Sequence, residues 1–338
     1  MQNLHTMKSV DYKTKAIRWG IIGCGDVTEK KSGPAFNLVN DSALVAVMRR
    51  DAVKAADYAK RHEVPFWFDD ANELINHPDV NAIYIATPPK YHEEYVAAAV
   101  NAGKPVYVEK PMSVDVASCK RMQDTADKAG VKLCIAHYRR AMPKFIQIKE
   151  LLDNKVIGDI RTVNITLMKV ASGAAVNNSW RVDPEIAGAG LFYDLAPHQL
   201  DLVSWFFGDA IHVAGFASNQ GHLYKAEDTV TGTMQFKNDV LFTGTWCFSV
   251  CKSAEKDVFE ITGTKGMISF PVFGHELSIT TEGETEVINY DPMPHIQQPM
   301  IEKVVQFFTG KAENPCTAAA AIKSMQMMES FAYGNRNK

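Results

Sequence analysis

Short apolar segments alternate with segments of helical composition throughout the first half of the chain. The apolar segments are bounded by glycine, proline or charged residues, and the segments between them are rich in alanine, lysine and glutamate. Short apolar runs are typical of strands buried on both faces, and their alternation with helices is typical of a parallel sheet. We therefore expect an α/β fold built on a doubly wound parallel sheet. The apolar segments are IRWGII, ALVAVM, VPFWF, AIYIAT, PVYVE and VKLCIAHY.

A glycine turn directly follows the first apolar segment. Gly23 and Gly25 have the spacing that lets the backbone turn tightly and approach a pyrophosphate, which favours a dinucleotide-binding Rossmann domain over residues 15–137. Thr28 stands in place of the third glycine of this fingerprint. The substitution predicts either a helix slightly further from the sheet or a hydroxyl group that meets a phosphate. We expect cofactor contacts from Gly23, Gly25, Asp26 and Val27.

The end of the second apolar segment is basic. Arg49 and Arg50 stand where an NAD-specific site usually has a carboxylate for the ribose hydroxyls, and Lys54 follows one turn later. Guanidinium groups match the geometry of a phosphate, and cations at a helix start oppose the helix dipole unless an anion binds there. The pattern favours NADP over NAD as the cofactor, with a solvated basic helix start as the alternative.

The second half of the chain has a different pattern. Strand-like segments follow one another at close spacing, with turn residues such as those of TKG and KND between them. Successive strands joined by short turns predict a mainly antiparallel, open sheet. We expect an α+β domain for substrate binding and oligomerisation over residues 138–338, and a flexible tail over residues 1–14.

Composition excludes several classes of partner. The net charge of the 338 residues is −3, with both signs mixed along the chain, so no nucleic-acid-binding or membrane-binding surface is expected. No apolar run is long enough to cross a bilayer. The six cysteines are scattered without a CxxC pair, which indicates the reduced thiols of a cytoplasmic protein and no metal site.

The segment GAGLFYDLAPHQLDL gathers ionisable residues inside an apolar helical pattern. Asp194, His198 and Asp201 have the spacing that places them on one face of a helix. Because Pro197 is tolerated only in the first turn, a helix is expected to begin near Tyr193 or Asp194, with Asp194 at or beside its N-cap. The unperturbed pKa of a histidine side chain would suit His198 to proton exchange near neutral pH, whereas Asp201 is expected to form a structural hydrogen bond. A satisfied core histidine and a capping aspartate are the alternatives.

Glu109 and Lys110 follow the buried segment PVYV. Ligands of doubly wound sheets bind at the carboxyl ends of the strands, where a lysine held by a following proline could donate to a substrate oxygen. Taken alone, a lysine at this position is usually a surface group.

Taken together, these segments resemble the Gfo/Idh/MocA family of pyridine-nucleotide oxidoreductases. The resemblance covers about residues 17–205, and it is greatest to the NADP-using branch that contains glucose–fructose oxidoreductase, 1,5-anhydrofructose reductase and dihydrodiol dehydrogenase. The segments that carry it are IIGCGDV, IATPPKYH, VEKP, YRR at 138–140, SWR at 179–181 and GAGLFYDLAPHQLD.

The resemblance implies roles for individual residues. Lys110, Asp194 and His198 would be catalytic, with Lys110 at the reacting oxygen and either Lys110 or His198 as the proton carrier. The further cofactor contacts that it implies come from Thr87, Pro88, His92, Glu109, Trp180 and Arg181. The substrate contacts that it implies come from Tyr138, Arg140, Lys110, Asp194 and His198.

The resemblance also implies a reaction. This is reversible hydride transfer between NADP(H) and an alcohol or carbonyl carbon of a sugar, polyol, inositol or cyclic diol, in a homodimer or homotetramer joined through the second sheet. Two alternatives stay open, namely an NAD-dependent glycoside hydrolase-like member of the superfamily and a non-catalytic regulator that senses NADP. The basic pair Arg49–Arg50 argues against the first, and the presence of Lys110, Asp194 and His198 argues against the second.

Overall fold

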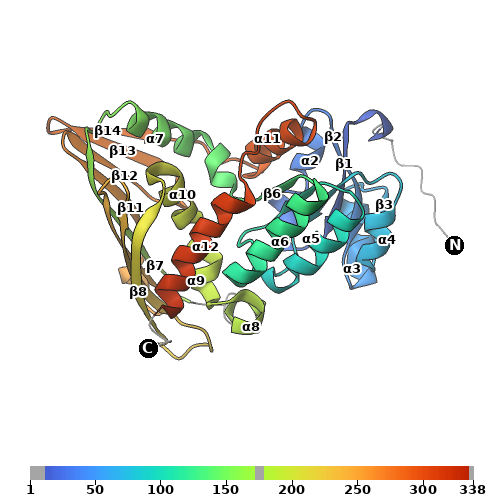
Figure 1. Cartoon of the computed structure of the whole chain (residues 1–338), viewed down its shortest axis with the longest axis horizontal. Helices are drawn as coiled ribbons and strands as arrows, with labels where there is room; N and C mark the ends of the chain where they lie inside the picture. Colours follow the sequence, from blue (N-terminus) through green and yellow to red (C-terminus); the bar gives the residue numbers. More distant parts are fainter. Residues whose placement is uncertain (1–11, 172–178, 335–338) are drawn as a thin grey trace.

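The computed structural model describes residues 12–171 and 179–334 and contains two β-sheets, each with its own helices. The sheets lie at opposite ends of the molecule, with the long helix α12 (Ala318–Tyr333) between them (Figure 1). The expected combination of an α/β part and an α+β part is therefore confirmed. Of the expected tail, residues 1–11 lie outside the described residues, and Tyr12–Thr14 form the 3-10 turn η1.

The first sheet has six parallel strands in the order β3-β2-β1-β4-β5-β6. Each apolar segment of the first half supplies one strand, and β2 is buried along its whole length. Helices join successive strands, as the alternation predicts. The elements are β1 (Ile17–Ile22), α1 (Asp26–Lys30), α2 (Ala35–Leu38), β2 (Ser42–Met48), α3 (Ala52–Arg61), β3 (Phe66–Phe68), α4 (Ala71–Asn76), β4 (Ala82–Ile85), η2 (Pro89–Tyr91), α5 (His92–Asn101), β5 (Val106–Val108), α6 (Val116–Ala129) and β6 (Leu133–Ile135).

The strand order reverses between β1 and β4. Chain connections leave this point in opposite directions, which opens a crevice at the carboxyl ends of the two strands. The fold therefore places the glycine turn after β1, the basic segment after β2 and Thr87 after β4 at one edge of the sheet.

The second sheet has eight strands in the order β14-β13-β12-β11-β7-β10-β9-β8. Neighbouring strands are antiparallel, as expected, except that β7 and β10 are parallel. The parallel pair arises because β7 enters the middle of the sheet, between strands that come much later in the chain. The strands are β7 (Ile160–Met168), β8 (Ala210–Ser218), β9 (Thr229–Phe236), β10 (Leu241–Cys247), β11 (Lys256–Gly263), β12 (Gly266–Phe270), β13 (Glu276–Thr281) and β14 (Glu284–Asn289).

Helices cover one face of this second sheet. Burial alternates along its strands, so that Val230 and Phe242 are buried whereas Thr231 and Thr243 are exposed. On the covered face, the indole Nε1 of Trp246 donates to Oε1 of Gln199 at 2.6 Å. This buried bond fixes helix α10 against the sheet. The other helices are η3 (Tyr138–Ala141), α7 (Pro143–Asp153), η5 (Trp180–Val182), α8 (Pro184–Ala187), α9 (Gly190–Leu195), α10 (Pro197–Phe207), η6 (Lys252–Ala254) and α11 (Gln298–Phe308).

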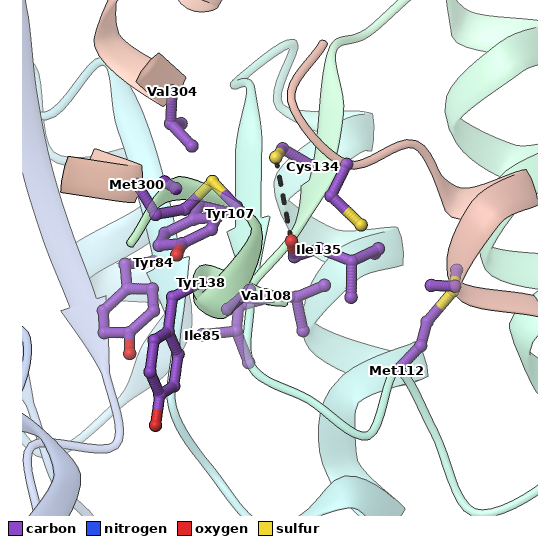
Figure 2. Packing of buried hydrophobic residues seen from close by; sticks show 14 of the residues in the cluster. Tyr84, Ile85, Tyr107, Val108, Met112, Cys134, Ile135, Tyr138, Met300 and Val304 are labelled. Carbon is purple, nitrogen blue, oxygen red and sulfur yellow. Dashed lines mark hydrogen bonds between the residues drawn. The ribbon is translucent and has the colours of Figure 1, made fainter. Parts of the chain in front are cut away.

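The last part of the chain returns to the first sheet. Helix α11 packs there, with Met300 beside Tyr107 in Figure 2 and the ring centroid of Phe308 5.5 Å from that of Trp19. The carbonyl of Cys316 then accepts from the amide of Ile135, at the edge strand β6, at 3.0 Å. The segment expected as the second domain thus contributes to both sheets.

Helix α12 lies against the second sheet and also contacts the first domain. It packs on β8, α10 and α6. Its Glu329 carboxylate accepts from the amide of Val116, at the start of α6, at 2.5 Å. Within residues 12–171 and 179–334, no helix combines the length and apolar composition that a membrane crossing requires.

Candidate active site

A cavity of about 400 Å³ lies at the carboxyl ends of β1, β2 and β4. It occupies the crevice where the strand order reverses. The structure brings most of the expected cofactor residues together here. Those that line the cavity are Gly23, Gly25, Asp26, Val27, Arg49, Arg50, Lys54, Thr87, Pro88, Trp180 and Arg181, joined by Cys24, Met48, Asp51, Ala86 and Tyr95.

The glycine turn has the shape that a bound dinucleotide requires. Gly23 has a φ of +94°, and a Cβ there would lie 2.8 Å from Cγ2 of Thr87, so the protein itself requires this glycine. A Cβ on Gly25 would meet only the carbonyl oxygen of Gly23, at 4.0 Å. No contact among the described residues requires a glycine at position 25, whereas the close approach of a pyrophosphate would require one. The hydroxyl of Thr87 is also buried, with no hydrogen-bond partner among the described residues. The cavity therefore fits a dinucleotide.

The structure argues against one of the two expectations for Thr28, a hydroxyl that meets a phosphate. Its hydroxyl donates to the carbonyl of Gly25 at 2.8 Å, and Tyr58 donates to the carbonyl of Thr28 at 2.8 Å. Thr28 is fully buried between these partners. The hydroxyl therefore satisfies the backbone of its own helix and is not directed at a phosphate.

The basic segment after β2 forms one wall of the cavity. The Arg49 guanidinium donates to the carbonyl of Cys24 at 3.2 Å, and the Arg50 guanidinium lies 5.1 Å from the centroid of the Tyr91 ring. Lys54 pairs with Asp51 at 3.1 Å, and the Asp51 carboxylate also accepts from the amide of Lys54 as the N-cap of α3. The sequence analysis did not select Asp51, although the preference for aspartate at an N-cap would have identified it.

Lys110 joins the end of β5 to helix α9. Its Nζ donates to the backbone carbonyl of Asp194 at 2.7 Å and to the carboxylate Oδ1 at 3.0 Å. Arg181 contacts the other carboxylate oxygen at 3.5 Å, and it also lines the cavity. Burial opposes the ionisation of Asp194, but Lys110 and Arg181 outweigh it and lower its pKa. Asp194 is therefore a carboxylate held between two cations.

His198 lies between two aromatic rings. Its ring centroid is 5.3 Å from that of Tyr138 and 5.7 Å from that of Phe273. Burial, together with the charges of Lys110 and Arg139, lowers the pKa of His198 well below its usual value, so the imidazole is neutral near pH 7. Its Nδ1 is buried, with no partner among the described residues. The sequence analysis did not identify Phe273, because it follows β12 and no motif marks it.

Two short helices replace the single helix expected around Pro197. Helix α9 covers Gly190–Leu195 and α10 begins at Pro197, so Asp194 lies in the last turn of α9 and not at an N-cap. Pro197 has no N–H to continue the α9 ladder, and it occupies the first turn of α10 as expected. Gly190 allows the earlier start, since its φ is +59° and a Cβ there would lie 2.6 Å from Cβ of Ala226.

Glu109 is buried in a network of side chains beneath Lys110. Tyr84 donates to its Oε1 at 2.5 Å, Gln297 donates to the same oxygen at 2.6 Å, and the Lys110 amide donates to Oε2 at 3.2 Å. Tyr107 in turn donates to Gln297 at 3.3 Å. Donors of the chain itself engage both carboxylate oxygens, so the side chain anchors the turn that carries Lys110. Gln297 precedes α11 and was not identified from the sequence.

Two further residues expected at the site have partners inside the protein. Arg140 forms two bonds, of 2.8 and 2.7 Å, to the carboxylate of Asp201, which is the structural bond expected of Asp201. His92 is fully buried and does not line the cavity; its ring nitrogens lie 2.8 Å from the carbonyl of Thr87 and 3.1 Å from that of Met112. His92 therefore supports the Thr87 turn from behind.

The described residues contain no group of histidine, cysteine and carboxylate side chains that could hold a metal ion. All six cysteines are unpaired thiols, and the thiols of the closest pair in the sequence, Cys247 and Cys251, form hydrogen bonds with serine and threonine side chains. The geometry therefore supplies a dinucleotide cavity and an adjoining cluster formed by Lys110, Asp194, Arg181 and His198.

Comparison with known proteins identifies two matching family profiles. Residues 17–137 match "Oxidoreductase family, NAD-binding Rossmann fold", and residues 145–269 match "GFO/IDH/MocA C-terminal domain". Oxidoreductase P35 from Formosa agariphila is 40% identical over 318 residues, which cover 93% of this chain and 98% of that protein. Trans-1,2-dihydrobenzene-1,2-diol dehydrogenase from Bos taurus is 30% identical over 253 residues, which cover 75% of this chain and 73% of that enzyme.

Solved structures have the same fold. An oxidoreductase from Thermotoga maritima superimposes with a TM-score of 0.84 and 25% identity, covering 94% of this chain and 96% of the other. Levoglucosan dehydrogenase in complex with NADH and levoglucosan superimposes with a TM-score of 0.82 and 21% identity, covering 95% and 97%.

The buried histidines around the site predict a loss of stability in acid. Burial lowers the pKa of both His92 and His137 to about 4, whereas a histidine in the unfolded chain titrates near 6.5. Their contribution to the free energy of unfolding is complete above about pH 6.5 and is lost as the pH falls toward 4, by about 1.4 kcal/mol per pH unit for each histidine. Urea unfolding at pH 7, 6 and 5 measures this slope.

The variant His92→Gln should reduce the change in the free energy of unfolding per pH unit by the contribution of one histidine. His275→Gln, at an exposed position, should leave this pH dependence unchanged. An unchanged slope in His92→Gln would mean that His92 takes up no proton on unfolding in this pH range. The folded ring would then already carry both protons and donate to both carbonyls, which contradicts a lowered pKa for His92.

Proposed function

The chain belongs to the Gfo/Idh/MocA family of oxidoreductases, and we propose that it transfers a hydride between NADP(H) and an alcohol or carbonyl carbon of a sugar, polyol, inositol or cyclic diol. The observation that carries the proposal is the cluster of Lys110, Asp194 and Arg181, in which Arg181 lines the dinucleotide cavity and Lys110 acts electrostatically on His198. The related dihydrobenzenediol dehydrogenase, whose name specifies a cyclic diol, supports the substrate class.

Lys110 is the residue proposed to bind the reacting oxygen. An ammonium group has three donors, and Asp194 accepts from Nζ through its carbonyl and one carboxylate oxygen. A further N–H is then available to a substrate oxygen. Asp194 and Arg181 fix the direction of that donor, and the positive charge stabilises an alkoxide as it forms.

His198 is the residue proposed to move the proton. A neutral imidazole can accept the hydroxyl proton when an alcohol is oxidised. The low pKa of His198 keeps it in the accepting form near neutral pH. Tyr138 and Phe273 pack edge-to-face with the buried imidazole, which limits the access of water to it. A bound nicotinamide supplies the hydride chemistry itself.

Replacing either residue tests these roles. We expect Lys110→Ala and His198→Ala to lower kcat/KM by about 10²–10⁴-fold, the usual contribution of a positioned acid–base group, and to leave cofactor binding largely intact. Steady-state kinetics measure the first quantity and nicotinamide fluorescence the second. Lys128→Ala, at an exposed position on α6, is the matched control. Full activity in either variant would exclude the assigned role.

We propose NADP as the preferred cofactor, with NAD as the weaker one. Arg49, Arg50 and Lys54 line the cavity, and Asp51, the carboxylate beside them, is already bound by Lys54 and by the start of α3. The net charge at this wall is therefore positive, which suits the 2′-phosphate of NADP.

Arg49→Asp tests the cofactor preference. The variant should raise the Kd of NADPH by about tenfold or more, because a charge-assisted bond to phosphate is replaced by repulsion, and should change the Kd of NADH much less. Fluorescence titration with both reduced cofactors measures the two constants. Lys60→Asp introduces the same charge change elsewhere on α3. Equal losses for both cofactors would reject the phosphate assignment.

We propose that residues 15–137 form the domain that binds the cofactor. Residues 138–338 then form the domain that binds the substrate and carries the oligomer interface. The face of the second sheet opposite the helices exposes Phe216 and Leu241 among its threonines. Two copies joined through this face would bury these groups as a homodimer, which could pair again into a homotetramer. The unpaired state of all six cysteines supports a cytoplasmic location.

Light scattering tests the proposed assembly. The native protein should have the mass of a dimer or tetramer, and Phe216→Lys should shift it toward the monomer, because a charge at that position would be buried unpaired in the interface. Lys237→Gln, on the loop between β9 and β10, is the control. A monomeric native protein would refute the assembly.

A further inference from the structure

Two aromatic rings hold the imidazole of His198. The ring of Tyr138 meets it edge-on at a centroid distance of 5.3 Å, and the ring of Phe273 does so at 5.7 Å. The Nδ1 atom of His198 is buried, and no described residue forms a hydrogen bond with it. The orientation of the imidazole therefore depends on where these two rings lie.

Phe273 belongs to the segment 271–275, which joins β12 to β13 and is called the Phe273 loop below. The Lys144 side chain, from the first turn of α7, is buried next to this loop. Its ammonium donates to carbonyls on both sides of Phe273, at 2.6 Å for Pro271 and 2.8 Å for Gly274. One buried cation therefore fixes the distance between the two ends of the loop.

Asp257 and Arg139 bind the middle of the Phe273 loop. The Asp257 carboxylate accepts from the amide of Val272 at 3.0 Å and from the amide of Phe273 itself at 2.6 Å. Nη1 of Arg139 donates to the carbonyl of Val272 at 2.8 Å. Together with the two contacts of Lys144, charged side chains thus bind five backbone groups of this short loop.

Arg139 also contacts both rings that flank His198. Its guanidinium carbon lies 4.7 Å from the centroid of the Phe273 ring and 5.4 Å from that of the Tyr138 ring. Arg139 is buried, and its Nε has no hydrogen-bond partner among the described residues. The face of an aromatic ring attracts a cation, and the attraction is stronger when the cation is withdrawn from water. Arg139 therefore ties the two rings to one buried charge.

Burial of these charges is unfavourable unless specific contacts compensate for it. The Asp257 carboxylate attracts both Arg139 and Lys144, which offsets part of the cost of burying them. Neither of the two cations lines the dinucleotide cavity, so a bound cofactor does not explain them. Turn residues and water are sufficient to satisfy an ordinary loop between neighbouring strands. The three charged side chains therefore fix the position of Phe273 more closely than the connection of two strands requires.

We propose that Arg139, Lys144 and Asp257 are positioning residues for the proton transfer. They fix the Phe273 loop so that Phe273, together with Tyr138, holds the His198 imidazole in a single orientation and away from bulk water. The proposal rests on the role of His198 in the proposed oxidoreductase function, and it names the residues that act through His198. None of the three positioning residues exchanges a proton itself.

Double-mutant cycles test whether these residues act through His198. The probes are D-glucose, myo-inositol and trans-1,2-cyclohexanediol with NADP⁺, and kinetics are measured with the probe that is oxidised fastest. Phe273→Leu and Lys144→Gln should each lower kcat by about tenfold, because the proton acceptor is misplaced, and should leave KM and the Kd of NADPH largely unchanged. In the His198→Ala background neither change should lower kcat further, because the residue through which they act is missing.

Matched controls and a second variant keep this test decisive. Lys149→Gln on the same helix α7, and Phe66→Leu at a half-buried position in β3, should leave kcat unchanged. Phe273→Leu keeps every charge of the cluster in place, so it tests the ring contact even if Lys144→Gln does not fold. A full further loss in the His198→Ala background, or a raised KM with an unchanged kcat, would overturn the proposal and leave the oxidoreductase function standing.

NMR of the NADPH-bound protein with ¹³C-labelled histidine Cε1 separates the two proposals, because it needs no turnover. The His198 signal is the one that His198→Ala lacks. The charged groups that act on His198 stay in place in Phe273→Leu and Lys144→Gln, namely Lys110, Arg139, His137 and Lys31. Entry of water should therefore raise the pKa of His198 in both variants, by about one pH unit or more.

The two outcomes of this measurement are distinct. An unchanged pKa of His198 in both variants rejects the positioning role, whatever the kinetics show. If none of the three probes is oxidised, the proposed reaction fails on these probes, and the pKa of His198 still decides whether the Phe273 loop positions and shields the imidazole.

Discussion

The Lys110 ammonium lies at the end of strand β5 in the first sheet, and the Asp194 carboxylate that it contacts belongs to helix α9 on the second. The two residues are 84 positions apart in the sequence, so their contact requires both sheets to be complete and correctly placed. Arg181 contacts the same carboxylate, so removing Asp194 would leave two partly buried cations without their counter-ion. The position of the cavity in the first domain relative to the residues proposed to transfer the proton therefore depends on this ion pair.

The Glu109 network supports the same turn from inside the protein. Glu109 is held by Tyr84 from the neighbouring strand and by Gln297 from the segment before α11, so three separate parts of the chain converge beneath Lys110. A buried carboxylate is tolerated only when its oxygens are satisfied, and here every donor comes from a rigid element. The result is a lysine whose backbone is fixed by one network and whose side chain is fixed by another.

Local patterns in the sequence predicted the first sheet well, because strand–helix alternation and the glycine turn depend on residues close together in the chain. The same holds for the placement of Pro197 in a first turn. The start of α9 at Gly190 was missed, since it depends on the close approach of Ala226, and the parallel pairing of β7 with β10 depends on strand order, which no local pattern records. Gln297 and Phe273 were missed for the same reason: each reaches the site from a distant segment and belongs to no motif.

The return of the chain to the first sheet has a consequence for biosynthesis. Strand β6 is the edge of that sheet, and the backbone group that pairs with its Ile135 comes from Cys316, close to the end of the chain. On the ribosome, the edge of the first sheet must therefore stay open until the segment around Cys316 has emerged. Open edges are sites of mispairing with other chains. The first domain to be synthesised therefore cannot complete its sheet edge before the second domain has been synthesised.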